Sequence, residues 1–126
     1  IKFANNENIY IKNWAELNTK KTDIFYYLDF NSPKDSQEAS FSAILNRKMY
    51  FNFVKGSFYS LDSLDLWAKK YETLKLIVSQ KQFHKLKNFD IKYLIVSNEF
   101  LTPNINYFSE YNISFKNEYI TIYQIN

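Results

Sequence analysis

Two spacings of apolar residues alternate along the chain and predict strands interleaved with helices. Short apolar runs of strand length occupy residues 23–30, 48–54 and 91–96, and they are rich in Tyr, Phe, Ile, Leu and Val. Such nearly continuous runs are typical of strands that are covered on both faces. Farther along, Asn112–Phe115 and Tyr119–Tyr123 alternate apolar and polar positions around Lys116-Asn117-Glu118, a pattern that predicts a C-terminal hairpin.

Between the apolar runs, apolar residues recur every three or four positions, as on the buried face of an amphipathic helix. The clearest helix begins after Ser60, and its repeating residues are Leu61, Leu64, Trp67, Ala68, Tyr71, Leu74 and Val78. Shorter helices are expected after Asn5 or Asn6, over 36–46 and around 80–87. The expected inward-facing residues of the first two are Ile11, Trp14 and Leu17, and then Ala39, Ala43 and Ile44, with Phe41 as a further candidate. Thr102-Pro103-Asn104 is expected to be a loop.

The order of these segments predicts a single α/β domain over residues 1–126. Strands that alternate with helices favour a βαβαβ unit, in which parallel strands are joined by right-handed crossovers. We therefore expect a small three-layer sandwich of four to five strands, parallel at its centre, with the antiparallel hairpin on one edge.

The composition supports a folded domain with a large aromatic core but lacks the residues of common catalytic and metal-binding motifs. Aromatic residues make up 20% of the chain, which has one glycine and no cysteine. Without glycine-rich loops, the usual phosphate-cradling motifs are missing, and without cysteine there is no thiolate metal site or disulfide. The net charge of +3 is mild and is spread along the chain. No run reaches the ~18 apolar residues that a membrane span requires.

No set of residues in the sequence predicts catalysis, a metal site or a cofactor. His84 is the only histidine and lies in the polar stretch Gln82–Lys85, which favours a solvated surface position. Asp62 and Asp65 fall in the first turns of the long helix, where carboxylates stabilise the helix dipole. Lysines interleaved with tyrosines are a pattern that can bind single-stranded nucleic acid. These tyrosines fall on core-facing positions, however, so no nucleic-acid partner is expected.

Arg47 is the only arginine beside fifteen lysines. A guanidinium offers a planar fork of donors, which suits a carboxylate, a phosphate or a sugar, or a buried ion pair. The structural pair is favoured, with Asp23, Asp29 or Glu99 as its partner.

Polar residues also follow the predicted parallel strands. Open α/β sheets bind ligands at the carboxyl ends of such strands, whereas the same composition is common in ordinary turns. The candidate ligand-binding residues, with Arg47 included, are Asp29, Asn31, Arg47, Lys55, Ser97, Asn98 and Glu99.

Five segments, taken in order, resemble one family of bacterial proteins. They are Trp14–Phe25, which is similar to "W-x-x-x-N-T-P-K-D-A-x-F", followed by Asn46–Phe51, Leu64–Trp67, Asp90–Val96 and Asn117–Ile125. The chain has Lys20 where proline is expected, and Thr22 is additional. The family is the C-terminal extramembrane domain of multipass membrane proteins that are uncharacterised or related to the polytopic (GT-C type) glycosyltransferases.

This resemblance implies a non-catalytic extracytoplasmic domain that follows the last membrane helix of a longer parent. Its partner would be the membrane-embedded portion of that parent, and it would help to position a glycan or lipid-linked substrate or contact another protein. Because the chemistry of such parents resides in membrane-embedded loops, no catalytic residue is carried over. Two alternatives stay open: a stand-alone small enzyme or polar-ligand-binding protein that uses the crevice at the strand carboxyl ends, and a nucleic-acid-binding module.

Overall fold

The computed structural model describes residues 5–28, 38–50 and 61–126. The predicted ligand-binding residues Asp29, Asn31 and Lys55 lie outside these ranges. The same holds for most of the predicted second strand after its first residues.

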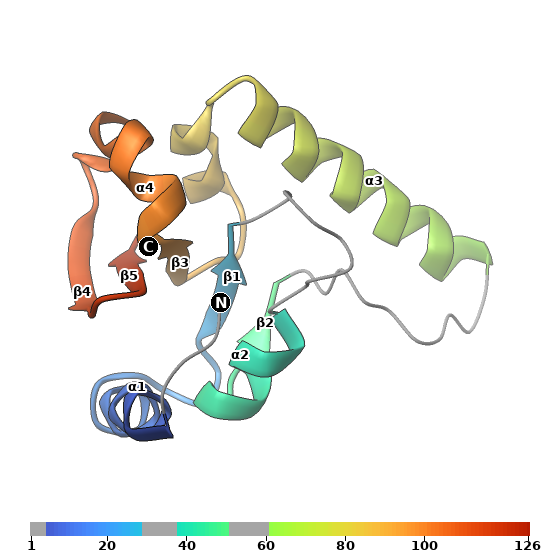
Figure 1. Ribbon diagram of the computed structural model, residues 1–126. Coiled ribbons are helices and arrows are strands. Elements are labelled where there is room, and N and C mark those ends of the chain that lie inside the picture. Colours follow the sequence, from blue (N-terminus) through green and yellow to red (C-terminus); the bar gives the residue numbers. More distant parts are fainter. Residues whose placement is uncertain (1–4, 29–37, 51–60) are drawn as a thin grey trace.

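The described elements follow the predicted alternation of strands and helices (Figure 1). The helices are α1 (Asn5–Asn18), α2 (Glu38–Leu45), α3 (Leu61–Ser79) and α4 (Asn98–Asn104), with 3-10 helices η2 (Phe83–Asn88) and η3 (Ile105–Phe108). The strands are β1 (Ile24–Tyr27), β2 (Lys48–Met49), β3 (Tyr93–Ser97), β4 (Asn112–Lys116) and β5 (Ile120–Gln124).

The strands form one mixed sheet in the order β2-β1-β3-β5-β4. β1 pairs in parallel with β2 and with β3, placing Phe25 opposite Tyr93, while β5 runs antiparallel to both β3 and β4. The hairpin therefore occupies one edge of a sheet that is parallel at its centre, and the predicted α/β fold is confirmed. A register shift between Ile113 and Phe115 interrupts the outer strand β4.

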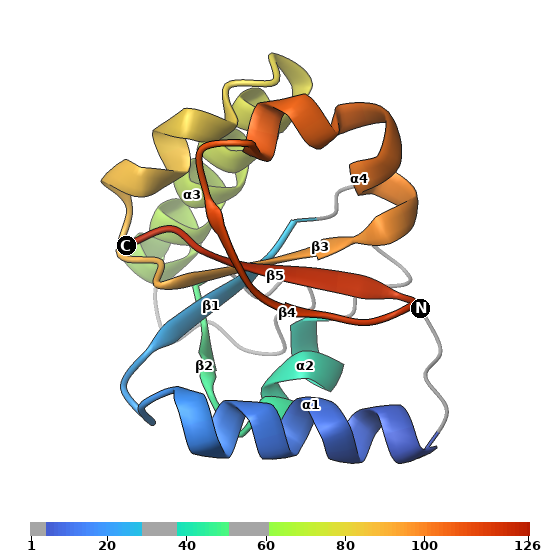
Figure 2. The same ribbon diagram turned by 90° about the vertical axis from the view of Figure 1, so that its left-hand side faces the viewer.

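Two hydrophobic cores lie on opposite faces of the sheet, between the helical layers seen in Figure 2. Alternate residues of β1 and β3 point to opposite faces, which explains why both strands read as continuous apolar runs. One core lies under α1 and α2 and holds Ile11, Ala15, Phe25, Tyr27, Phe41, Leu45, Tyr93, Ile95, Ile120 and Ile122. The other lies under α3, η2, α4 and η3 and includes Tyr26, Leu28, Leu74, Ile77, Phe83, Leu94, Val96, Phe108 and Tyr123.

Two predictions of inward-facing helix residues are wrong. Leu17 is 84% exposed, because two steps of three residues from Ile11 rotate it by about 120° away from the buried stripe. In α2, Ala43 is exposed while Phe41 is fully buried, so the helix faces the sheet through its larger side chains. Burying Phe41 removes far more apolar surface from water than burying an alanine would.

The predicted loop Thr102-Pro103-Asn104 is also wrong, because these residues form the second half of α4. Their polar side chains bond the carbonyls of the preceding turn instead of breaking it: Thr102 Oγ1 donates to Asn98 O at 2.8 Å, and Asn104 Nδ2 donates to Phe100 O at 2.9 Å. Pro103 sits near the end of a seven-residue helix, where its missing N–H removes only one backbone bond.

Candidate functional site

Ser97 and Asn98 lie where β3 ends and α4 begins, at the predicted carboxyl edge of the sheet. Ser97 is buried, and its hydroxyl accepts a hydrogen bond from Phe100 N at 3.2 Å. Extended backbone at Ser97 followed by this bond makes it the N-cap of α4. The hydroxyl group that was a candidate for ligand binding is therefore used to begin a helix.

Asn98 ties the end of β3 to the C-terminal hairpin. Its backbone N–H donates to Tyr119 O at 2.9 Å, and its side-chain Nδ2 donates to Asn117 O at 2.8 Å. Its Oδ1 accepts a 2.7 Å bond from Thr121 Oγ1, a hydroxyl on a fully buried residue. Both ends of the amide are thus held by bonds within the fold, with one N–H and one lone pair left over.

Of the three candidates after β3, Glu99 alone has an exposed side chain. The structure brings Ser97, Asn98 and Glu99 together at one strand end, as predicted. Since Asp29, Asn31 and Lys55 lie outside the described residues, the rest of the predicted crevice stays a prediction.

Arg47 is 6% exposed and joins the end of α1 to the segment between α2 and β2. Its Nε donates to Thr19 Oγ1 at 3.0 Å and its Nη2 donates to Ala15 O at 3.1 Å and Thr19 O at 3.3 Å. On the other side, Nη1 donates to Asn46 O at 2.9 Å and to Leu45 O at 3.4 Å.

Of the carboxylates predicted to pair with Arg47, Asp23 and Glu99 form no ion pair with it, and Asp29 lies outside the described residues. No described carboxylate forms an ion pair with it; its bonds go to a hydroxyl and to carbonyls near the ends of two helices. The last carbonyls of a helix lack partners within the helix and carry partial negative charge, which explains why a guanidinium suits them. All three guanidinium nitrogens donate within the fold, as a structural role requires.

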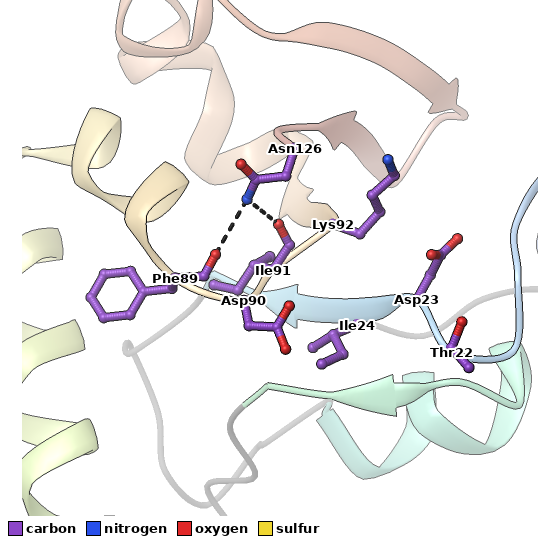
Figure 3. A pocket seen from close by; sticks show the side chains of 8 residues that line it. All are labelled: Thr22, Asp23, Ile24, Phe89, Asp90, Ile91, Lys92 and Asn126. Carbon is purple, nitrogen blue, oxygen red and sulfur yellow. Dashed lines mark hydrogen bonds between the residues drawn. The ribbon is translucent and has the colours of Figure 1, made fainter.

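A polar depression of about 200 Å³ lies at the amino-terminal ends of the parallel strands β1 and β3, away from the carboxyl ends where Ser97 and Asn98 lie (Figure 3). Its lining comes from the segments before these two strands and from the end of β5: Thr22, Asp23, Ile24, Phe89, Asp90, Ile91, Lys92 and Asn126. In Figure 3 the carboxylates of Asp23 and Asp90 lie on either side of Ile24. The volume is below the range of about 300–1,000 Å³ that is typical of small-molecule sites.

The hydrogen bonds around this depression hold the fold together. Asn126 Nδ2 donates to Ile91 O at 2.6 Å and to Phe89 O at 3.3 Å (Figure 3). Asp23 Oδ2 accepts a 2.8 Å bond from Lys20 N and closes the turn before β1. Among the described residues, Lys92 forms no ion pair with either carboxylate.

The charges of both carboxylates affect nearby tyrosines. Burial, and secondly the charge of Asp90, raises the pKa of Tyr50, and burial followed by the charge of Asp23 does the same to the pKa of Tyr93. These phenols stay protonated at neutral pH, so neither supplies a general base. Lys70 Nζ lies 4.3 Å from the centre of the Tyr50 ring and donates to Tyr50 O at 3.3 Å, while burial and the charge of Lys48 lower its pKa.

This depression was missed by sequence reasoning, although a signal for it was present. Asp23 directly precedes β1, and Asp90 and Lys92 directly precede β3, so the pairing of parallel strands had to bring them to one edge. The described residues hold no group of three or more His, Asp or Glu side chains that would bind a metal ion. The depression is a turn-rich rim with two carboxylates and one ammonium group.

Comparison with known proteins gives no match to a family model, to a curated protein or to a solved structure. In the described part of the chain, no helix is both long enough and apolar enough to cross a bilayer.

Proposed function

We propose that this chain is a non-catalytic extracytoplasmic domain of a bacterial polytopic membrane protein of the glycosyltransferase-like class. In that role it helps to position a glycan or lipid-linked substrate, or binds a partner, while a membrane-embedded portion of the same parent carries any chemistry. The observation that carries the proposal is the use of the candidate polar side chains inside the fold. Arg47, Ser97 and Asn98 are bonded to helix ends and to the hairpin instead of facing a cleft.

Trp14 and Asn117, from the first and last segments that carry the family resemblance, connect elements of the fold, which suits a scaffolding domain. Trp14 packs its ring 5.7 Å from that of Tyr93 and 5.5 Å from that of Phe115, between α1 and two strands. Asn117, in the closing motif, bonds Tyr119 N and Ile120 N through Oδ1 at 2.8 Å and so shapes the hairpin turn. Contacts of this kind hold elements together, which supports a role that depends on a fixed shape.

The gene sequence upstream of Ile1 tests the proposal directly. We expect several hydrophobic segments of about 20 residues, each long enough to span a bilayer. Fractionation of cells that express the complete gene product should then place it in the membrane, with this domain open to a protease added outside the cytoplasmic membrane. A start codon directly before Ile1, or turnover of a substrate by the purified chain alone, would contradict the proposal.

The alternative of a stand-alone ligand-binding protein is supported less well by the described residues. It would need the crevice at the strand carboxyl ends, where Ser97 and Asn98 are already bonded. Thermal-shift screening against glycans and polar metabolites separates the two ideas. A ligand whose stabilising effect is lost in Glu99→Gln, the exposed member of the set, would favour the alternative.

A further inference from the structure

The solvent-facing side of α1 carries large apolar side chains that no other described helix or strand covers. Ile9 is 56% exposed, Tyr10 58% and Leu17 84%, and α1 forms the lower boundary of the molecule in both ribbon views (Figures 1 and 2). At about 100° per residue, these three residues and the exposed Asn13 fall within an arc of about 100°, with Asn13 near its centre. We call these four residues the α1 outer face.

Contacts with the core fix the orientation of this face. Ile11 and Ala15, on the other side of α1, are fully buried against the sheet. On the flank toward the hairpin, the Trp14 ring lies 5.5 Å from the Phe115 ring of β4. Rotating α1 to hide its outer face would break these contacts. A helix with apolar residues on both sides normally packs against a neighbour on each side.

Asn13 gives this face a polar centre that can pair with itself. Its exposed amide forms no hydrogen bond within the described part of the chain. An amide offers both a donor and an acceptor, so two copies related by a two-fold axis can bond through the same residue, and an asparagine in an apolar helix contact fixes the register. An antiparallel pair of helices centred on Asn13 places Tyr10 against Leu17 of the second copy, because the two lie three and four residues from that centre.

The charged residues around the outer face favour the same arrangement. Residues 5–23 include three acidic and three basic residues, and the adjoining hairpin adds Lys116 and Glu118, so the net charge is zero. Such a surface attracts neither a polyanion nor a polycation. In the antiparallel pair, Lys12 lies about 3 Å along the helix axis from Glu16 of the second copy and on the same flank. Both side chains are exposed, so opposite charges meet twice across the two-fold axis.

We propose that the α1 outer face binds a second copy of this chain through an antiparallel contact between the two α1 helices, with Asn13 at the two-fold axis. One helix face is smaller than the roughly 800 Å² per partner of a standard interface, so the dimer is weak, with a dissociation constant on the order of 100 µM. The inference rests on the exposed residues of α1 and does not require the proposed function.

Sedimentation equilibrium of the whole chain, from about 5 µM to about 1 mM, measures this association. We expect a monomer at the lowest concentration and mostly dimer at the highest. Leu17→Glu should weaken the association at least about tenfold, because it buries a charge in the apolar contact. Leu76→Glu is the matched control: it changes a leucine that is 54% exposed on the opposite helical layer, and it should associate as the parent does. A parent chain that stays monomeric at the highest concentration, or equal association by Leu17→Glu, would overturn the proposal.

Charge reversal tests the antiparallel register. Lys12→Glu and Glu16→Lys, each alone, should weaken association about fivefold, because like charges then face each other across the two-fold axis. A 1:1 mixture of the two variants should associate about as well as the parent, since each reversed charge then meets its opposite on the other chain. The pairing of these residues within one helix stays disrupted in the mixture, so recovery reports contact between chains. A mixture that associates no better than the single variants would refute the contact.

Cross-linking at Asn13 tests the position of the two-fold axis. The chain has no cysteine, so Asn13→Cys introduces its only thiol. Helix axes about 8–10 Å apart, with Cα atoms about 2.3 Å from each axis, bring the two Cα atoms to about 4–5 Å, close enough for a disulfide. Mild oxidation at about 100 µM protein should join the chains of this variant and leave Lys85→Cys, exposed on the opposite layer, largely monomeric. Circular dichroism establishes that every variant keeps the fold, and equal cross-linking of the two cysteine variants would contradict the proposed axis.

Discussion

Replacing Arg47 tests whether this side chain is a structural joint, as the geometry indicates. Arg47→Met keeps most of the buried aliphatic stem and removes the guanidinium, which makes five contacts of 2.9–3.4 Å with oxygens. A hydrogen bond from a charged donor contributes ~1.5–3 kcal/mol, so the four contacts of 3.3 Å or less sum to roughly 6–12 kcal/mol before any cost is subtracted.

Two effects reduce that sum. Burying a guanidinium costs several kcal/mol, which the methionine variant recovers. Ala15 O also accepts bonds from Thr19 N at 3.0 Å and Thr19 Oγ1 at 2.6 Å, so it is not left without a donor. We therefore expect the free energy of unfolding to fall by about 2–4 kcal/mol, a large part of the ~5–15 kcal/mol that stabilises a typical domain.

Urea denaturation followed by tryptophan fluorescence measures this loss. Trp14 lies on α1 next to Ala15, and a Trp67→Phe background leaves Trp14 as the sole reporter of the α1 side. Arg47→Lys keeps the charge but has no planar fork, so it should restore less than half of the loss. Lys12→Met, an exposed position on α1, is the control and should change stability by less than about 0.5 kcal/mol. The reasoning is refuted if Arg47→Met is as stable as its parent, or if Arg47→Lys matches arginine.

Three further predictions concern the hairpin joint, the α4 cap and alkaline pH. Asn98→Ala should lower the free energy of unfolding by about 1–3 kcal/mol, because it leaves the buried Thr121 hydroxyl without its acceptor. A double-mutant cycle with Thr121→Val, measured by urea denaturation, should give a coupling energy of about 1 kcal/mol or more. Strict additivity of the two substitutions would show that the bond contributes nothing to stability. Ser97→Ala should lower the thermal midpoint by removing a cap that contributes ~1 kcal/mol, whereas Glu99→Gln should leave the midpoint unchanged to within a degree or two. Burial, and secondly the charge of Glu110, raises the pKa of Tyr111 to about 12. The folded state therefore favours the protonated phenol, and this stabilisation is complete below the unfolded pKa near 10. It disappears as the pH rises toward 12. The stability difference between the parent and Tyr111→Phe, measured in urea at pH 9 and pH 11.5, should shrink by about 2 kcal/mol, and a constant difference would contradict the assignment.

Local pattern was enough for the fold but not for the orientation of every helix. The apolar runs of β1 and β3 could only be strands covered on both faces, and the two cores confirm it. The side of α1 and α2 that faces the sheet was harder to predict, because steps of three residues drift around a helix. Leu17 was misplaced for that reason, whereas Ala43 was misplaced because α2 buries the larger Phe41 instead.

The candidate site was likewise predicted in part: the positions of its residues followed from the sequence, but their hydrogen bonds did not. Ser97, Asn98 and Glu99 were correctly placed together after a strand, because strand ends follow from the apolar pattern. Whether their donors and acceptors were free could not be predicted, since the partner of Asn98 is Thr121, 23 residues away. The depression bordered by Asp23 and Asp90 also depends on which strands are neighbours.

The sequence by itself determined the class of fold, the order of the strands and of the helices before the third strand, and the absence of cysteine and glycine-loop chemistry, because these depend on residue type and short-range spacing. Only the tertiary structure decided what Arg47 bonds, which polar groups are already satisfied, and which side of α1 stays exposed. The physical reason is that hydrogen bonds and ring contacts act over a few ångströms between residues far apart in the chain, and strand pairing brings those residues together.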